Sequence, residues 1–162
     1  MNKVIELICT NVKIYTAVQF GFDLNLDVEF INRVDNLVVF DKNCDWAWKC
    51  IEEIAQMDEE WVLDYELFLE EKDLPNHMDP YETFDMAYIS NRGSKTYLND
   101  VLLECFKMKV PYIITNPAVP KKKSVAGYNR VLFTSADIYD NNNEYVLYYQ
   151  DIVARKLREA NE

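Results

Sequence analysis

Glycine and histidine are both scarce in this sequence. The chain has only three glycines among its 162 residues, Gly21, Gly93 and Gly127, and no two of them lie close together in the sequence. This excludes the glycine-rich phosphate loops of the Walker and G-x-G-x-x-G types, which need several glycines at fixed spacing. His77 is the only histidine, which excludes metal centres built from several histidines. We therefore expect no metal site and no cofactor.

Cysteine pairs and long apolar runs are also missing. The four cysteines show no C-x-x-C spacing, and such a set is more typical of reduced core thiols than of a disulfide framework or a zinc site. They are Cys9, Cys44, Cys50 and Cys105. No run of about 18 apolar residues occurs, and the first apolar run is too short for a signal sequence. We expect an intracellular, cytoplasmic protein that does not enter a membrane.

Negative charge is abundant, and it is concentrated in one segment. The formal net charge of the chain is −11. Residues 52–85 hold 13 acidic side chains and one basic side chain, a net charge of −12, whereas all other residues together carry a net charge of +1. Carboxylates at this density repel free nucleic acid and attract basic protein surfaces.

The clearest structural signal is a β-α-β pattern over residues 84–116. An apolar run ends in the turn-forming stretch 90–94, which closes with Ser94, a good helix N-cap. A helix is then predicted over 95–109, because apolar side chains recur on one face at Leu98, Val101, Leu102, Cys105 and Phe106. The apolar run 110–115 predicts a second strand. Such a unit joins two parallel strands.

The regions on either side give weaker patterns. Before residue 42, apolar and alternating runs predict strands at 12–20, 22–30 and 37–40, and the run 3–10 suits a strand or a short helix. Their close spacing leaves no room for crossover helices, which predicts an antiparallel meander. Residues 46–57 are predicted to be a helix, and 61–69 a strand, although its glutamates also suit a helix. After residue 116, a long loop leads to a strand at 131–133 and a final helix that begins near residue 144.

Together these patterns predict a single α/β (or α+β) domain over residues 1–162 with a mixed sheet. An N-terminal antiparallel meander (1–41) is followed by an acidic helix, strand and loop segment (42–83). A Rossmann-like β-α-β-β-α portion (84–162) completes the domain.

The first functional hypothesis uses the acidic segment. Carboxylates interleaved with aromatic anchors predict a non-enzymatic interaction protein or inhibitor, which would bind a basic, nucleic-acid-handling protein and imitate nucleic acid there. The partner-binding residues are predicted to be Asp58, Glu59, Glu60, Trp61, Asp64, Glu66, Glu70, Glu71 and Asp73. Direct binding to nucleic acid or membrane is not expected. The small number of glycines and the many Asn, Asp, Tyr and Lys residues favour a viral or phage source. The alternative role for the acidic segment is a face that only keeps the protein in solution.

The alternative hypothesis uses loops that follow the later strands. Loops 90–94, 116–123 and 135–137 would lie at the carboxyl ends of parallel strands, where ligands of α/β proteins bind. There they would bind, or act on, a nucleotide or another phosphorylated small molecule. The ligand-binding residues are then predicted to be Arg92, Gly93, Ser94, Lys121, Lys122, Lys123 and Asp137. No catalytic residue can be assigned under either hypothesis. The turn after Gly93 lacks a well-placed carboxylate, so the sequence supports no family assignment.

Overall fold

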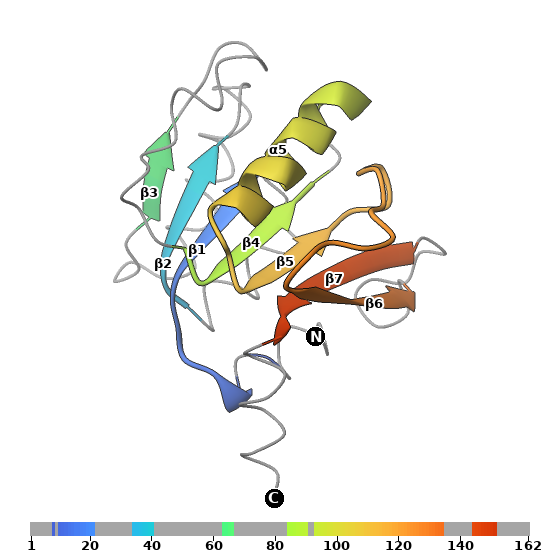
Figure 1. The fold of residues 1–162 in the computed structure, drawn as a ribbon. Coiled ribbons are helices and arrows are strands. Elements are labelled where there is room, and N and C mark those ends of the chain that lie inside the picture. The colour runs from blue at the N-terminus through green and yellow to red at the C-terminus, as the bar shows by residue number, and fades with distance from the viewer. Residues whose placement is uncertain are drawn as a thin grey trace, which may run out of the picture.

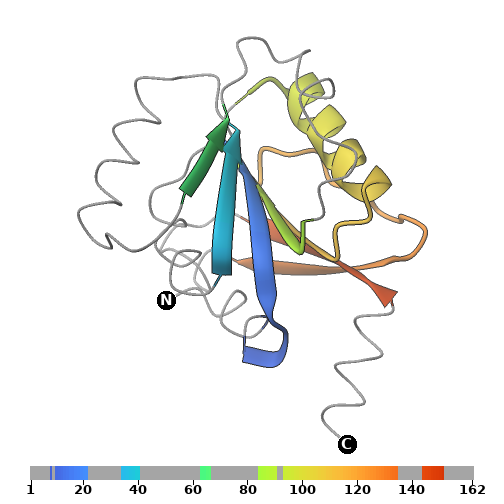
Figure 2. The same ribbon diagram turned by 90° about the vertical axis from the view of Figure 1, so that its left-hand side faces the viewer.

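One seven-stranded sheet forms the centre of the structure, with the helix α5 packed on one face (Figures 1 and 2). The computed structural model describes residues 8, 10–21, 34–40, 63–66, 84–90, 93–134 and 144–151. The helix is α5 (Lys95–Lys107), and the strands are β1 (Ile14–Phe20), β2 (Val34–Phe40), β3 (Leu63–Glu66), β4 (Met86–Ile89), β5 (Tyr112–Thr115), β6 (Tyr128–Thr134) and β7 (Glu144–Gln150). Their order across the sheet is β3-β2-β1-β4-β5-β7-β6. The predicted α/β fold with a mixed sheet is confirmed.

The first five strands in this order are parallel, so the predicted antiparallel meander is wrong. β1 pairs with β2 and β4, β2 with β3, and β4 with β5, in every case parallel. Residues 21–33 separate β1 from β2, a length that suffices for a crossover between parallel strands. The purely apolar run 37–40 also suits a parallel strand better than the edge of a meander. The predicted strand at 22–30 lies outside the described residues, as does the predicted helix at 46–57.

The central β-α-β prediction is confirmed by β4, α5 and β5. Ser94 caps the helix, because its side-chain oxygen accepts a hydrogen bond from the backbone N–H of Tyr97 at 3.1 Å. The predicted apolar stripe faces the sheet, with Phe106 only partly buried. The buried helix residues are Tyr97, Leu98, Val101, Leu102 and Cys105.

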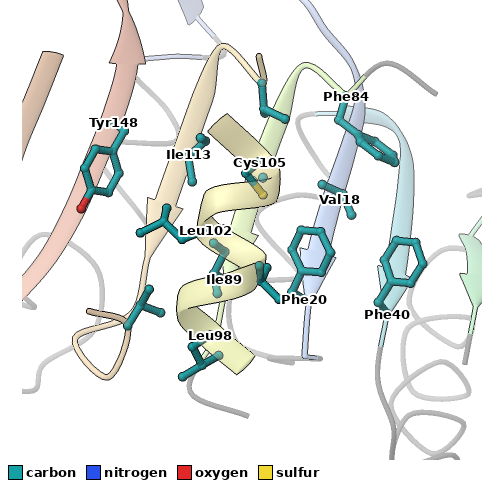
Figure 3. Packing of buried hydrophobic residues seen from close by; sticks show 14 of the residues in the cluster. Val18, Phe20, Phe40, Phe84, Ile89, Leu98, Leu102, Cys105, Ile113 and Tyr148 are labelled. Atoms are coloured by element: carbon teal, nitrogen blue, oxygen red, sulfur yellow. The ribbon is translucent and has the colours of Figure 1, made fainter. Parts of the chain in front are cut away.

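The main core lies between α5 and the sheet (Figure 3). Phe20 of β1 and Phe40 of β2 stack with ring centroids 5.5 Å apart, and Leu102 of α5 and Ile113 of β5 belong to the same core. Burying each large apolar side chain contributes about 2 kcal/mol to folding. Cys105 is a free, fully buried thiol, as predicted, and burial raises its pKa far above the ordinary value. It therefore acts as a core side chain.

The predicted final helix is wrong over residues 144–150, which form a strand, and its part beyond residue 151 lies outside the described residues. Residues 144–150 form β7, which pairs antiparallel with β5 on one side and with β6 on the other. Its Tyr-Val-Leu-Tyr-Tyr sequence fits both a helical stripe and a strand, and the two neighbouring strands decide in favour of the strand. The predicted strand at 131–133 is confirmed within β6. The predicted strand at 61–69 is confirmed at β3, over residues 63–66, and its other residues lie outside the described ones.

The described residues at the N-terminus form a helical turn. Ile8, Thr10 and Asn11 are helical, and the N–H of Val12 donates to the carbonyl of Ile8 at 2.8 Å, which is the spacing of a helical turn. At residues 8 and 10, the described part of the stretch 3–10, the short-helix alternative is therefore the correct one. Among the described residues, no helix is long and apolar enough to cross a membrane.

Candidate functional site

The strand order reverses direction between β1 and β4. From β1 the chain moves outward through β2 to β3 and then returns to the other side of β1 as β4, followed by β5. Crossover connections on the two sides of such a point lead away from each other. In open α/β sheets the ligand binds at this switch point, outside the carboxyl ends of the strands. The carboxyl ends of β1 and β4 therefore define the candidate site.

The carboxyl ends of four strands are held level by backbone hydrogen bonds. Each bond reaches one residue beyond a strand: Gly21 N–H donates to the carbonyl of Phe40 at 2.7 Å, and Ser90 N–H donates to that of Phe20 at 3.0 Å. Asn116 N–H donates to the carbonyl of Ile89 at 2.9 Å. These bonds join the ends of β2, β1, β4 and β5 along one edge of the sheet.

Ser90, which follows β4, is hydrogen-bonded to the end of β1. Besides its backbone bond, its hydroxyl donates to the same Phe20 carbonyl at 2.9 Å, and the side chain is 2% exposed. Both lone pairs of that carbonyl are thus used at the end of β1. Ser90 fixes the distance between the chain ends that leave β1 and β4.

Gln19 carries an unusual buried amide beside this point. Val18 and Phe20 belong to the core under α5, so the side chain of Gln19 projects from the opposite face of β1. It is fully buried, and within the described part of the chain neither its Nε2 nor its Oε1 has a hydrogen-bond partner. An unpaired buried amide costs about 1–3 kcal/mol, so each such group in a native fold calls for an explanation.

Gly21 follows directly at the end of β1 and has a φ of +83°. This left-handed conformation favours glycine, because a residue without a Cβ adopts it at no steric cost. Sequence reasoning noted Gly21 only as an isolated glycine. A signal was present nonetheless, because Gln19 is a polar residue inside an apolar strand, two positions before a glycine.

Gly93 and Ser94 begin α5 at the carboxyl end of β4. Gly93 has a φ of +149°, and an added Cβ would lie 2.4 Å from Cδ1 of Tyr97, so the Tyr97 ring covers the glycine. The first turn of the helix contains no acidic residue. Its exposed N–H groups and the positive end of the helix dipole therefore favour a carboxylate or another anion.

The structure brings some of the predicted ligand residues to this edge and places others elsewhere. Gly93 and Ser94 lie at the switch-point side of β4, while the loop after β5 starts at the same edge and then runs back over the α5 face. Lys122 sits on that face, where its N–H donates to the Tyr148 hydroxyl at 2.9 Å. Arg92 and Asp137 lie outside the described residues.

The predicted partner-binding residues are mostly outside the described residues. Asp64 and Glu66 belong to β3, at one edge of the sheet. The others, Asp58, Glu59, Glu60, Trp61, Glu70, Glu71 and Asp73, are not described. Among the described residues, no three His, Cys, Asp or Glu side chains gather closely enough to hold a metal ion.

Solved structures share this fold. No family model matches the sequence, and neither does any curated protein. An O-methyltransferase from Bacillus cereus in complex with SAH has a TM-score of 0.68 at 10% identity and covers 91% of this chain and 79% of that chain. N-methyltransferase NodS from Bradyrhizobium japonicum WM9 has a TM-score of 0.61 at 10% identity, and the match covers 91% of this chain and 92% of NodS. An rRNA methylase from Streptococcus thermophilus has a TM-score of 0.61 at 10% identity, and the match covers 91% of this chain and 93% of the methylase.

These likenesses overturn the prediction of a non-enzymatic acidic inhibitor. The chain has the Rossmann-like fold of methyltransferases, and at this identity the likeness concerns the fold alone. The error came from reasoning on the charge of 52–85, because net charge informs about association and solubility and not about fold. The viral, inhibitor and nucleic-acid-mimic attributions fall with it, and a basic protein partner stays an untested prediction.

Proposed function

We propose that this chain binds an S-adenosyl cofactor at the carboxyl ends of β1 and β4 and is a methyltransferase-type domain. The observation that carries the proposal is the unpaired, fully buried amide of Gln19 at the switch point. A bound ligand with both donor and acceptor groups would satisfy the Nε2 and Oε1 of Gln19. The likeness to methyltransferase structures, one of them in complex with SAH, supports this choice of ligand.

The residues present fit an S-adenosyl ligand better than a phosphorylated nucleotide. The chain has a single glycine at the end of β1 and no glycine-rich phosphate loop. S-adenosylmethionine has no phosphate and therefore needs no such loop. Its polar adenosine matches the neutral amide of Gln19, and its carboxylate matches the N-terminus of α5 after Gly93 and Ser94.

The chain's own residues would bind and orient the cofactor and its substrate. When bound, S-adenosylmethionine supplies a methyl group attached to a positively charged sulfur. Gly21 adopts the left-handed conformation at the end of β1, Ser90 holds β4 against β1, and Gln19 anchors neutral polar atoms. The hydrogen-bonded edge made by these strands would fix the direction in which the methyl group points.

Calorimetric titration with S-adenosylhomocysteine tests the proposal. We expect saturable binding to the full chain and a rise in melting temperature that grows with ligand concentration. ATP and NADH serve as phosphate-bearing comparisons and should bind more weakly. Binding of ATP without binding of S-adenosylhomocysteine would instead favour the phosphorylated ligand predicted from the loops.

Replacing the unpaired amide separates ligand binding from stability. Gln19→Leu keeps the size of the side chain and removes its polar atoms. The free energy of unfolding should rise by about 1 kcal/mol, because an unpaired buried amide is lost. Affinity for S-adenosylhomocysteine should fall about tenfold or more, which corresponds to about 1.4 kcal/mol. Chemical denaturation and calorimetry measure the two effects.

The matched control is Gln150→Leu. Gln150 lies at the end of β7, beside the start of β5 and therefore away from the carboxyl ends of the parallel strands. Gln150 is paired, since its Nε2 donates to the carbonyl of Lys109 at 2.9 Å. This variant should lose stability and keep its affinity, the reverse of Gln19→Leu. Unchanged affinity in Gln19→Leu would remove Gln19 from the binding site.

A further inference from the structure

Positive charge gathers in one continuous part of the described structure. Residues 93–134 contain seven basic side chains, Lys95, Lys107, Lys109, Lys121, Lys122, Lys123 and Arg130, against two acidic ones, Asp100 and Glu104. Their net charge is therefore +5 in a chain of net charge −11. These residues form α5, β5, the loop that follows it, and β6. Charge is therefore segregated along this chain, and its net value does not describe residues 93–134.

The loop that carries three of these lysines is pinned by its backbone. Val119 is 2% exposed and belongs to the core under α5. The N–H of Lys122 donates to the Tyr148 hydroxyl at 2.9 Å, and the carbonyl of Lys122 accepts from Nη1 of Arg130 at 3.0 Å. The side chains of Lys121 and Lys123 are exposed. A fixed backbone with outward lysines loses less conformational entropy on binding than a loose basic tail does.

An exposed apolar side chain lies next to the basic loop. Arg130 pairs with Tyr148 and Leu132 with Val146, and both β7 residues belong to the core under α5. Arg130 and Leu132 therefore lie on the same face of β6 as the loop. Leu132 is 46% exposed, although it is a large apolar residue at the outer strand of the sheet.

We propose that Lys121, Lys122, Lys123, Arg130 and Leu132 form a docking surface for single-stranded nucleic acid. The proposal rests on the proposed function, because it names the substrate class of the cofactor site. The loop leaves β5 at Asn116, one strand from β4, so a strand bound along it leads to the switch point. Single-stranded nucleic acid is held by basic side chains that follow its backbone and by contacts to its unstacked bases.

The arrangement fits a polymer better than a small phosphate. A single phosphate group is best held by several groups that converge on one point. Here Lys121 and Lys123 are exposed side chains of a surface loop, and Arg130 is exposed on the neighbouring strand. Such spread charges match the successive phosphates of a nucleic acid strand. The repulsion expected from residues 52–85 weakens beyond about 8 Å at physiological salt.

Fluorescence anisotropy with a labelled single-stranded RNA of twelve nucleotides tests the proposal, and DNA of the same sequence is the second arm. The full chain should bind at low salt and release the strand as salt rises. Replacing Lys121, Lys122 and Lys123 by alanine should weaken binding at least tenfold. It should also reduce the slope of log affinity against log salt by about 2, since each lost phosphate contact contributes about 0.7. Preference for RNA over DNA would show that the 2′-hydroxyl is read.

Three controls isolate the surface. Replacing Lys121, Lys122 and Lys123 by arginine keeps their positive charge and should keep the affinity for the nucleic acid strand. Lys13→Ala removes one exposed lysine beside Tyr15, away from the loop, and should change affinity less than twofold. All variants should bind S-adenosylhomocysteine like the parent, because the loop residues lie apart from Gln19 and Gly21.

The outcomes distinguish the two proposals. The docking surface is ruled out if the parent binds S-adenosylhomocysteine and no RNA or DNA, or if the triple alanine variant binds the strand as the parent does. Equal competition by polyglutamate of the same charge would also overturn it, because the surface would then select charge alone. RNA binding without any S-adenosylhomocysteine binding would overturn the cofactor proposal and leave the docking surface supported.

Discussion

At the scale of single residues, Lys109 occupies a position that normally belongs to glycine. It follows the last turn of α5 with a φ of +57°. Its N–H donates to the carbonyl of Phe106 at 3.0 Å, and the N–H of Val110 donates to that of Cys105 at 3.2 Å, the bond pair of a Schellman motif. Lys109→Gly should raise the free energy of unfolding by about 1 kcal/mol, because a left-handed conformation is costly for any residue with a Cβ. Urea denaturation measures the change.

The same substitution two residues earlier should have the opposite effect on stability. Lys107 is exposed like Lys109 and still lies within α5. Lys107→Gly should lower the free energy of unfolding by about 0.5–1 kcal/mol, because glycine in a helix carries a larger entropic cost. A loss of stability in both variants would show that the lysine at position 109 makes contacts that outweigh its backbone strain.

At the scale of elements, an aromatic group fastens α5 to the antiparallel strands. Phe106 meets the rings of Tyr128 and Tyr148 edge-on, with centroids 5.0 and 5.1 Å away. The Tyr128 hydroxyl donates to the carbonyl of Val110 at 2.7 Å, just beyond the helix. This bond requires a protonated phenol, and burial raises the pKa of Tyr128 above its ordinary value.

Alkaline pH should therefore weaken this junction. The folded state holds the phenol proton more tightly than the unfolded state, so the stabilisation is complete below pH about 10 and declines as pH rises further. Tyr128→Phe should cost about 1 kcal/mol at pH 8 and lose less stability than the parent between pH 10 and 11. The control is Tyr149→Phe in β7, which should leave the loss of stability at alkaline pH unchanged. Thermal melts across this pH range measure the stability of both variants. If the melting temperature of Tyr128→Phe falls with pH as steeply as that of the parent, the Tyr128 phenol has no such role.

The elements that the sequence predicts well are those whose signals are local. The cap at Ser94 and the stripe of α5 each lie within a few residues, so the β-α-β unit was recovered with nearly correct ends. The pairing of β1 with β2 and the strand character of 144–150 depend on partners far away in the sequence, which no local pattern specifies. The same holds for the candidate site. The local turn and cap pattern predicts that Gly93 and Ser94 precede α5, whereas the buried, unpaired state of Gln19 depends on the fold.

At the scale of the whole molecule, self-repulsion among carboxylates should make stability depend on salt. A net charge of −11 destabilises the compact state at low ionic strength, and salt screens this repulsion. The melting temperature at pH 7 should therefore rise between about 10 and 150 mM NaCl, where the Debye length shortens to about 8 Å. Near the sequence pI of about 4.6 the net charge vanishes, and the rise should shrink. A melting temperature that falls with salt at pH 7 would mean that attractive ion pairs dominate. Since the same salt series should strengthen the fold and release a bound nucleic acid strand, release at high salt reports the docking surface and not unfolding.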